Sequence, residues 1–255
     1  MSVNLKQARV DPIIGNSKPV TIMNINFTSL SKQELLTECL FPVLMSRSKC
    51  FIVTANPEIV MNTRDIPGYK QIVQSADIVV PDGAGIVMAA KYLKLPIQER
   101  IPGFELMLDL LEFANEQNLS CYFLGATEKT SSKFIREINK SYPNIQIAGF
   151  HHGYFKDDKM IVKQISESTP DIVFVAMGSP KQDEWITSTY GQFSKGLFMG
   201  VGGSFDVIAG EVKRAPDKWI KLNLEWLYRL LKQPFRLKRI VRSFAFLILV
   251  MVKKE

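Results

Sequence analysis

Short apolar runs alternate with amphipathic stretches along the first 212 residues of the chain. The runs are rich in Val, Ile and Phe and are apolar at nearly every position. This pattern is typical of strands that are buried on both faces of a parallel sheet. It predicts strands at Val20–Ile25, Phe51–Thr54, Ile78–Val80, Ser120–Leu124, Ile145–Ala148, Ile172–Ala176 and Leu197–Gly200.

The stretches between these runs have the three- and four-residue apolar spacing of amphipathic helices. They predict helices at Lys32–Met45, Gly83–Leu93, Phe104–Gln117, Ser131–Ser141, Lys159–Ser168 and Lys181–Thr189. Alternating strands and helices predict an α/β fold, with a mostly parallel, Rossmann-like sheet and helices on both of its faces. We expect this α/β domain to span residues 1–212, followed by a basic amphipathic helical appendage at 213–255.

Small, polar or glycine-rich residues follow five of the predicted strands. These segments are 54–57, 81–83, 125–127, 177–180 and 200–204. Ligands of open α/β sheets bind beyond the carboxyl ends of the strands. The five segments together therefore predict a binding site at that edge of the sheet.

Asp82 follows one of these strands and is succeeded by Gly83 and Gly85. One interpretation is an N-cap, because an Asp side chain accepts hydrogen bonds from the first turn of a helix. The other is a general base, because a carboxylate fixed by a strand and flanked by open backbone is accessible to a substrate hydroxyl. The local pattern leaves both interpretations open.

Asn56 and Pro57 carry a helix-start signal, with Asn as the N-cap and Pro at the first helical position. A structural role is therefore the simpler explanation of this pair. Thr54 and Asn56 also offer side-chain hydrogen bonds to a sugar. Arg100 has two interpretations as well, a surface ion pair with Glu99 or a contact with a phosphate.

Two further segments are suited to an anion. Ser179 and the proline after it form a second helix-start signal, preceded by Gly178 and followed closely by a lysine, and helix N-termini bind anions. Gly202 and Gly203 lie in a loop of the kind that approaches phosphates, although it matches neither the P-loop nor the Gly-x-Gly-x-x-Gly pattern. Together the segments favour a diphosphate-bearing ligand such as a nucleotide sugar.

Charge divides the chain unevenly. The net charge is +7, yet residues 213–242 alone contain ten Lys or Arg and only two acidic residues. Aromatic residues are interleaved with these cations, and an apolar run, 244–252, follows them. A basic, aromatic amphipathic segment is typical of membrane-surface binding, and the run is too short to span a bilayer. We expect the membrane-binding residues to be Arg229, Lys232, Arg236, Arg239 and Arg242.

The cysteines and histidines of the sequence argue against a disulfide framework and a metal site. The three cysteines lack metal-ligand spacing and are typical of reduced core residues. The two histidines are adjacent, so they cannot converge on one metal from a single helix face. We therefore expect no metal site, no cofactor and no secretory signal in the first residues.

With these motifs assembled, the chain resembles the WecG/TagA/CpsF family of bacterial glycosyltransferases from about residue 20 to residue 242. No single motif is specific, but their order and spacing are. The resemblance is carried by Thr54–Glu58, Pro81–Val87, Glu99–Gly103, Gly178–Asp183, Gly202–Asp206, Arg214–Pro216 and Glu225–Leu230. One departure is Asp183, where the family pattern leads us to expect Glu.

The resemblance implies transfer of an N-acetylmannosamine-type or related sugar from a UDP-sugar donor to an undecaprenyl-diphosphate-linked sugar, in cell-surface polysaccharide or teichoic acid synthesis. The reaction inverts the anomeric centre and needs no metal. Asp82 corresponds to the general base, Thr54 and Asn56 to residues of the same pocket, and Arg100 and Gln182 to residues that bind the diphosphate or the sugar. The appendage docks on the membrane and closes over the site.

Stabilisation of the leaving UDP then requires arginines and helix N-termini, for which we expect Arg100 and Arg214. Gly178, Ser179, Gly202 and Gly203 are expected to bind the donor. The enzyme is expected to be peripheral, at the cytoplasmic face of an anionic membrane, without a nucleic-acid partner; formation of a homo-oligomer is left open.

Two alternatives stay open. The first is the same family with another donor, UDP-glucose or a UDP-uronic acid, in capsule or exopolysaccharide synthesis. The second is a non-catalytic nucleotide- or RNA-binding protein with a basic tail.

Overall fold

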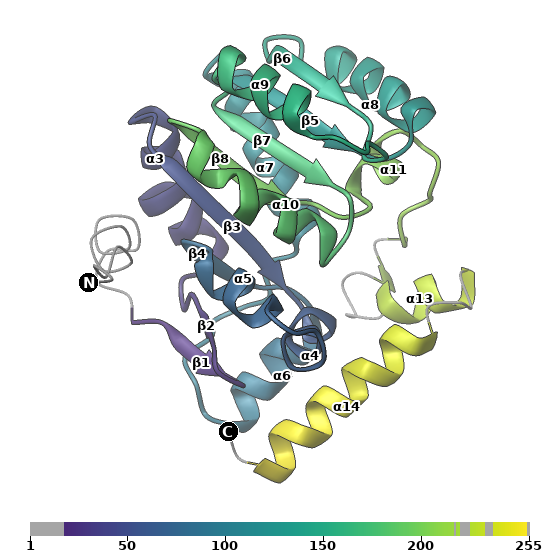
Figure 1. The fold of residues 1–255 in the computed structure, drawn as a ribbon. Coiled ribbons are helices and arrows are strands. Elements are labelled where there is room, and N and C mark those ends of the chain that lie inside the picture. The colour runs from purple at the N-terminus through teal and green to yellow at the C-terminus, as the bar shows by residue number, and fades with distance from the viewer. Residues whose placement is uncertain (1–17, 217, 220–224, 233–236, 254–255) are drawn as a thin grey trace.

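The computed structural model describes residues 18–216, 218–219, 225–232 and 237–253. In this part of the chain a six-stranded sheet has the order β4-β3-β8-β7-β5-β6, and every strand pair is parallel (Figure 1). The predicted α/β class is confirmed. The strands are β3 (Lys49–Ala55), β4 (Ile78–Pro81), β5 (Ser120–Gly125), β6 (Gln146–His151), β7 (Ile172–Ala176) and β8 (Gly196–Gly200).

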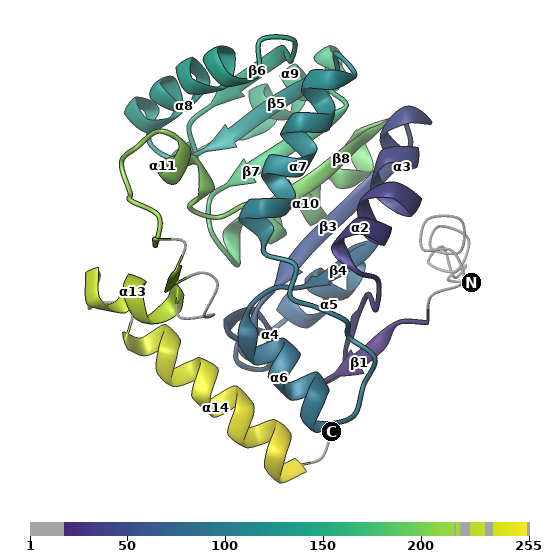
Figure 2. The same ribbon diagram turned by 180° about the vertical axis from the view of Figure 1, so that it is seen from behind.

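Helices cover both faces of the sheet, as Figures 1 and 2 show from opposite sides. One face packs against the π-helix η1 (Leu35–Leu40), α3 (Phe41–Met45), α7 (Gly103–Glu116), α8 (Glu128–Ser141) and α11 (Ser204–Ile208). The other packs against α4 (Pro57–Asp65), α5 (Tyr69–Ser75), α6 (Ala84–Tyr92), α9 (Lys159–Ser168) and α10 (Lys181–Thr189). The remaining short elements of this region are α2 (Lys32–Glu34) and the 3-10 helix η2 (Tyr190–Gln192).

The apolar strands divide their side chains between two cores. Phe123 and Phe174 lie in the core beneath α7 and α8, whereas their neighbours Tyr122 and Val173 lie in the core beneath α9 and α10. This alternation follows from the period of two along a strand. It explains why runs without polar positions predict the sheet correctly.

The prediction of a single strand at 20–25 is wrong. The segment is a hairpin of two antiparallel strands, β1 (Val20–Ile22) and β2 (Ile25–Phe27). Met23 and Asn24 both have positive φ, of 47° and 62°, as a two-residue hairpin turn requires. The turn is inconspicuous in the sequence because Met is rare in this conformation.

The predicted helices are all present within a few residues at each end, but three elements of the region 20–212 were not fully predicted. Only the start of α4 was foreseen, and α5 and α11 were missed altogether. Both missed helices are short. The segment predicted as one helix at 32–45 is helical throughout but contains the π-helical turn η1.

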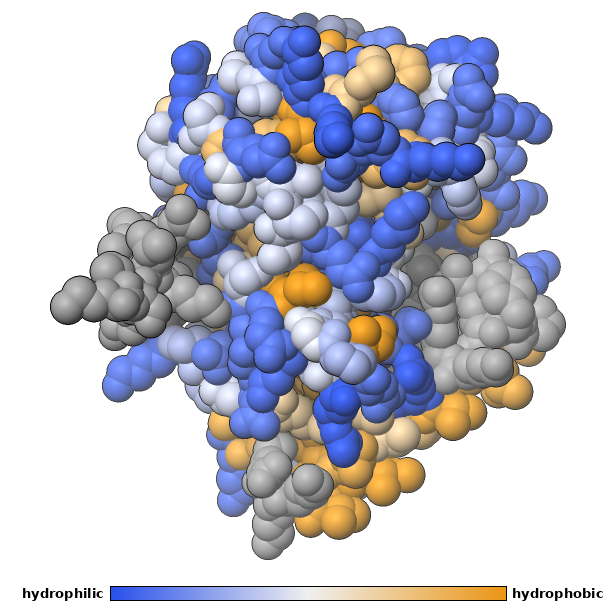
Figure 3. Space-filling view, in the orientation of Figure 1, coloured by the Kyte–Doolittle hydropathy of each residue, from blue (hydrophilic) through white to orange (hydrophobic). Residues whose placement is uncertain are grey.

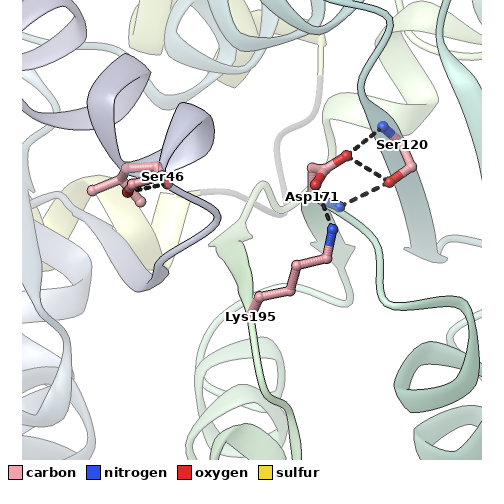
Figure 4. A network of polar contacts seen from close by, with 5 residues as sticks. Ser46, Ser120, Asp171 and Lys195 are labelled. Carbon is pink, nitrogen blue, oxygen red and sulfur yellow. Dashed lines mark hydrogen bonds and ion pairs between the residues drawn. The ribbon is translucent and has the colours of Figure 1, made fainter.

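The amino-terminal ends of the strands are joined by half-buried polar contacts. The Asp171 carboxylate accepts hydrogen bonds from the Ser120 amide at 2.9 Å and hydroxyl at 2.7 Å, and it pairs with Lys195 Nζ at 2.6 Å (Figure 4). Burial alone raises the pKa of Asp171, but the bonds from Lys195 and Ser120 outweigh it, so the pKa lies below the ordinary value. These contacts connect the starts of β5, β7 and β8.

The C-terminal appendage contains α13 (Glu225–Lys232) and α14 (Leu237–Lys253), and α14 packs along α4 and α6. Phe246 and Val250 are buried in the core beneath these helices. No helix among the described residues is long and apolar enough to cross a bilayer. The predicted boundary at residue 212 is not decided by this packing and stays a prediction.

Candidate active site

A cavity of about 1260 Å³ lies at the carboxyl ends of the strands. In Figure 1 the arrows of β3 and β7 point toward the side of the molecule where α13 and α14 lie. All five predicted segments contribute to the lining, the segment 200–204 with every residue and the other four in part. The sheet therefore brings the sequence-predicted loops together, as its parallel topology requires.

Thr54 and Asn56 follow one another at the end of β3, and both line the cavity. The Asn56 side chain accepts a hydrogen bond from the Ile59 amide at 3.0 Å and caps α4, which confirms the helix-start prediction. Thr54 packs against Gly103, where an added Cβ would lie 2.8 Å from the Thr54 hydroxyl oxygen. The start of α7 is thereby held against β3.

Asp82 lies at the end of the neighbouring strand, β4, with its side chain 23% exposed. It does not cap α6, because Gly83 occupies that position with φ +93°, so the N-cap interpretation is wrong. Its Oδ2 accepts from the Gly103 amide at 3.4 Å, and Oδ1 lies 3.6 Å from Arg100 Nε. The carboxylate is thus positioned by the sheet and faces the cavity.

Arg100 is placed beside Asp82 by its own backbone. The next residue, Ile101, donates its amide to the Pro81 carbonyl at 2.9 Å, which attaches the loop to the end of β4. The Glu99 carboxylate accepts from the Lys32 amide at 2.7 Å. Arg100 is therefore part of the cavity wall.

Gln182 joins two glycine loops. Its Oε1 accepts from the Gly178 amide at 3.1 Å and from the Gly202 amide at 3.0 Å, and the side chain is 5% exposed. A Cβ on Gly200 would lie 2.4 Å from Gln182 Nε2, so this position requires glycine. The amide side chain lines the cavity and also fixes the backbone around it, a second role that the sequence did not reveal.

Behind these loops lies a buried polar cluster. Ser179 was expected to cap α10, but Pro180 holds the N-cap position, and the Ser179 hydroxyl instead lies 2.6 Å from the Tyr69 hydroxyl. Tyr69 also donates to Asp183 Oδ2 at 2.5 Å. Burial raises the pKa of Asp183 to about 6, although the bond from Tyr69 opposes the shift. The cluster connects α5 to the start of α10.

Several helices begin at the cavity. The first residues of α4, α6, α7 and α11 line it, as do the residues just before α8 and at the start of α10. Helix N-termini present unpaired amide groups and partial positive charge. A diphosphate is therefore well matched to this edge of the sheet.

Arg214 is placed differently from our expectation. It forms an ion pair with Glu105 in the first turn of α7, and its Cζ lies 4.7 Å from the centre of the Phe104 ring. Glu105 and Phe104 line the cavity, whereas Arg214 is not among the lining residues and its neighbour Lys213 is. Proximity in sequence to the glycine loop at 202–204 did not predict this pairing with α7.

The basic residues assigned to the membrane fall into distinct environments. Lys232 is exposed at the end of α13 and lines the cavity. Arg242 pairs with Asp65 at 2.8 Å and hydrogen-bonds Asn62, so it attaches α14 to α4. Arg229 and Arg239 lie within α13 and α14, and Arg236 lies outside the described residues.

The cavity lining also includes Tyr154, Lys181 and Asp206, which were not among the expected site residues. Tyr154 is exposed at the cavity wall, and Lys181 donates to the Gly153 carbonyl at 2.8 Å. Asp206 also lines the cavity, and burial, with a smaller effect of Glu211, raises its pKa. Asp206 closes the Gly202–Asp206 motif, which was the available signal for it.

Comparison with known proteins identifies the family of this chain. A family model described as Glycosyl transferase WecG/TagA/CpsF family matches residues 20–255. The chain belongs to this family. It is therefore a glycosyltransferase, and the alternative of a non-catalytic nucleotide- or RNA-binding protein is set aside.

Two curated relatives of this WecG/TagA/CpsF glycosyltransferase share one name, N-acetylglucosaminyldiphosphoundecaprenol N-acetyl-beta-D-mannosaminyltransferase. The protein from Bacillus spizizenii is 42% identical over 191 residues, covering 75% of this chain and 74% of the relative. The protein from Staphylococcus aureus strain MRSA252 is 40% identical over 230 residues, covering 88% and 90%.

Proposed function

We propose that this glycosyltransferase moves an N-acetylmannosamine-type sugar from a UDP-sugar onto N-acetylglucosamine carried by undecaprenyl diphosphate. The names of the two relatives support this donor sugar and this acceptor. The cavity supports a diphosphate-bearing donor, because helix N-termini and glycine loops surround it.

The observation that carries the mechanism is the placement of Asp82 at the cavity wall, at the end of β4. Asp82 takes the proton from the acceptor hydroxyl while that oxygen forms a bond to the anomeric carbon. The bond from this carbon to the UDP oxygen breaks in the same step, and UDP leaves with the electron pair. One displacement inverts the anomeric centre without a covalent sugar–enzyme intermediate.

The leaving UDP needs electrostatic stabilisation. Arg100 and the helix starts at Gly178–Lys181 and Gly202–Ser204 supply positive charge and amide donors around the cavity. Lys213, which lines the cavity next to Arg214, supplies a further cation, whereas Arg214 is paired with Glu105. Gln182 holds the two glycine loops in the conformation that receives the donor.

We also propose that turnover needs no divalent metal. Among the described residues no group of three His, Cys, Asp or Glu side chains is arranged to hold an ion. The experiment is to measure turnover in excess EDTA. Full activity is the expected result, and loss that Mg²⁺ or Mn²⁺ restores would contradict it.

The appendage, we propose, holds the enzyme on an anionic membrane, from the cytoplasmic face. Val241, Phe244 and Ile248 are 59%, 54% and 60% exposed and lie on one face of α14, opposite the buried Phe246 and Val250. Figure 3 shows apolar side chains gathered along the lower edge of the molecule, where α14 runs in Figure 1. Basic residues beside an apolar helix face are suited to anionic lipid.

Co-sedimentation with vesicles tests this attachment. We expect binding to vesicles with anionic lipid, weakened by salt, and reduced by Val241→Ser with Ile248→Ser. Met45, which is 59% exposed on the far helix α3, provides the control variant Met45→Ser. Equal binding of the two variants would refute attachment through α14.

A donor panel tests the reaction itself. The purified protein is incubated with the lipid-diphosphate acceptor and UDP-N-acetylmannosamine, UDP-glucose or a UDP-uronic acid, and released UDP is measured. We expect acceptor-dependent release with the N-acetylmannosamine donor and an inverted linkage by NMR. Preference for glucose or a uronic acid would replace the donor assignment, and a retained linkage would overturn the single displacement.

A further inference from the structure

The cavity changes character along its length. Near Asp82 its wall is polar, with Thr54 and Arg100, whereas the side formed by α6, α13 and α14 is mostly apolar, although Tyr228, Lys232 and Ser243 also line it. The apolar lining residues there are Met88, Trp226, Ile240, Phe244 and Leu247. Lys213 and Lys232 also line the cavity, and both are exposed.

Helical spacing explains how this apolar side leads away from Asp82. On α6, Gly85, Met88 and Tyr92 are three and four residues apart and therefore share a face. Gly85 and Met88 line the cavity, Met88 is 54% exposed, and Tyr92 is 48% exposed at the end of the helix. The line of residues begins three positions after Asp82 and extends about 12 Å along α6.

The facing helix repeats the arrangement. Ile240, Phe244 and Leu247 share a face of α14 and line the cavity. Phe244 is 54% exposed, and its ring meets Trp226 of α13 edge-on at 6.1 Å. Farther along, the Tyr92 hydroxyl donates to the Met251 carbonyl at 3.4 Å, which connects the ends of α6 and α14. Met88 and Phe244 stay accessible although the two helices are in contact.

We propose that this groove between α6 and α14 binds the first isoprene units of the acceptor lipid. The inference rests on the proposed function. A UDP-sugar offers an apolar wall only its uracil ring and the faces of its sugars, and it has no hydrocarbon chain to fill a groove that runs along a helix. The acceptor carries a sugar, a diphosphate and a hydrocarbon chain, and the cavity offers a matching wall for each: Asp82, the lysines Lys213 and Lys232, and the apolar groove. Burial of hydrocarbon against Met88 and Phe244 then fixes the sugar hydroxyl at Asp82.

The groove has a role separate from membrane attachment. Ile248 follows Leu247 on α14 and is 60% exposed, but it does not line the cavity. A surface that only contacts a bilayer uses both residues alike. A lipid-binding groove contacts its ligand through Leu247 and not through Ile248. It also binds a single acceptor molecule in solution, without any bilayer.

The experiment compares two soluble acceptors without vesicles, N-acetylglucosaminyl diphosphate esterified with a farnesyl chain or with a methyl group. We expect the unmodified enzyme to have a KM at least about tenfold lower for the farnesyl acceptor, since only this one buries hydrocarbon. Met88→Gln with Phe244→Gln should abolish this preference by raising the KM for the farnesyl acceptor to that for the methyl acceptor. The matched control, Ile248→Gln, should keep the preference.

Two results would contradict the proposal that the groove binds the acceptor lipid. One is an equal KM for both acceptors in the unmodified enzyme. The other is a preference that survives the double substitution, even if vesicle binding falls, since that assigns Phe244 to the membrane surface. Failure of the proposed function gives a different result, namely no turnover on either acceptor with any UDP-sugar. Unfolding curves of the variants, whose mutated side chains are half exposed, verify that they are folded.

Discussion

Aspartates occupy both edges of the sheet, and their surroundings differ. At the amino-terminal edge Asp171 is bonded by Ser120 and Lys195 at 2.6–2.9 Å. Asp77 likewise accepts from the Phe51 amide and the Tyr190 hydroxyl, each at 2.7 Å. At the carboxyl-terminal edge Asp82 meets Gly103 at 3.4 Å and Arg100 at 3.6 Å, and it faces a cavity.

The difference separates a carboxylate that stabilises the fold from one that is available for chemistry. Short bonds from fixed donors hold the charge of Asp171 in place and lower its pKa. Asp82 instead lines the cavity, where a substrate hydroxyl can reach its carboxylate, as general-base catalysis requires. The comparison therefore predicts that equivalent substitutions at the two edges have opposite consequences.

Asp82→Asn should have the largest effect. The amide keeps the shape of the side chain but cannot accept the proton, so we expect turnover to fall by about 10²–10⁴-fold. UDP binding, measured by calorimetry, should be unchanged, as should the urea midpoint. A variant that retains more than about a tenth of the rate would show that Asp82 is not the base.

Asp171→Asn should reverse this outcome. Loss of the charged partner of Lys195 is expected to lower the free energy of unfolding by about 1–3 kcal/mol, measured with urea at neutral pH. Because the pKa of Asp171 is depressed, its contribution is present above the unfolded pKa and is lost as the pH falls through the folded one. The rate per folded molecule should stay normal, and a hundredfold loss of rate would break the comparison.

The glycine loops of the carboxyl-terminal edge provide a third test. Gln182→Ala leaves the amides of Gly178 and Gly202 without their shared acceptor, so we expect the KM for the donor to rise about tenfold, in line with loss of one or two hydrogen bonds. Gln164→Ala removes an amide that accepts from Tyr122 on the other side of the molecule, and it should leave this KM unchanged. If the two variants had the same KM for the donor, Gln182 would not contribute to donor binding.

The sequence predicted the sheet well because parallel strands buried on both faces have an unmistakable apolar pattern. It also predicted the loops at the carboxyl edge, since topology alone brings them together. It could not place Arg214, whose pairing with Glu105 joins residues 109 positions apart. Nor could it distinguish the two sides of the run 244–252, because the choice between buried Phe246 and exposed Phe244 depends on how α14 packs on α4 and α6.

Asp183 refines the comparison, because it belongs to the carboxyl-terminal side yet accepts short hydrogen bonds like the aspartates of the other edge, and unlike them it is fully buried. Burial raises its pKa from the ordinary 3.8 to about 6, and hydrogen bonds from Tyr69, Ser179 and Gln182 favour the charged form. Because the folded state holds the Asp183 proton more tightly than the unfolded chain, this proton contributes to the free energy of unfolding. The contribution is fully present below pH 3.8 and is lost as the pH rises through about 6. Above that pH Asp183 is charged, so the hydrogen bond from the Tyr69 hydroxyl contributes most to stability there.

Tyr69→Phe should therefore cost more stability at pH 8 than at pH 5. A hydrogen bond to a charged group contributes about 1.5–3 kcal/mol and a neutral one about 1 kcal/mol, so we expect the losses measured with urea to differ by about 1 kcal/mol. Tyr122→Phe is the matched control, because the Tyr122 hydroxyl donates to the uncharged Gln164 side chain, and its cost should be the same at both pH values. If Tyr69→Phe were equally costly at pH 5 and pH 8, Asp183 would not be a charge stabilised by Tyr69, and its buried hydrogen bonds would no longer explain why this aspartate stabilises the fold.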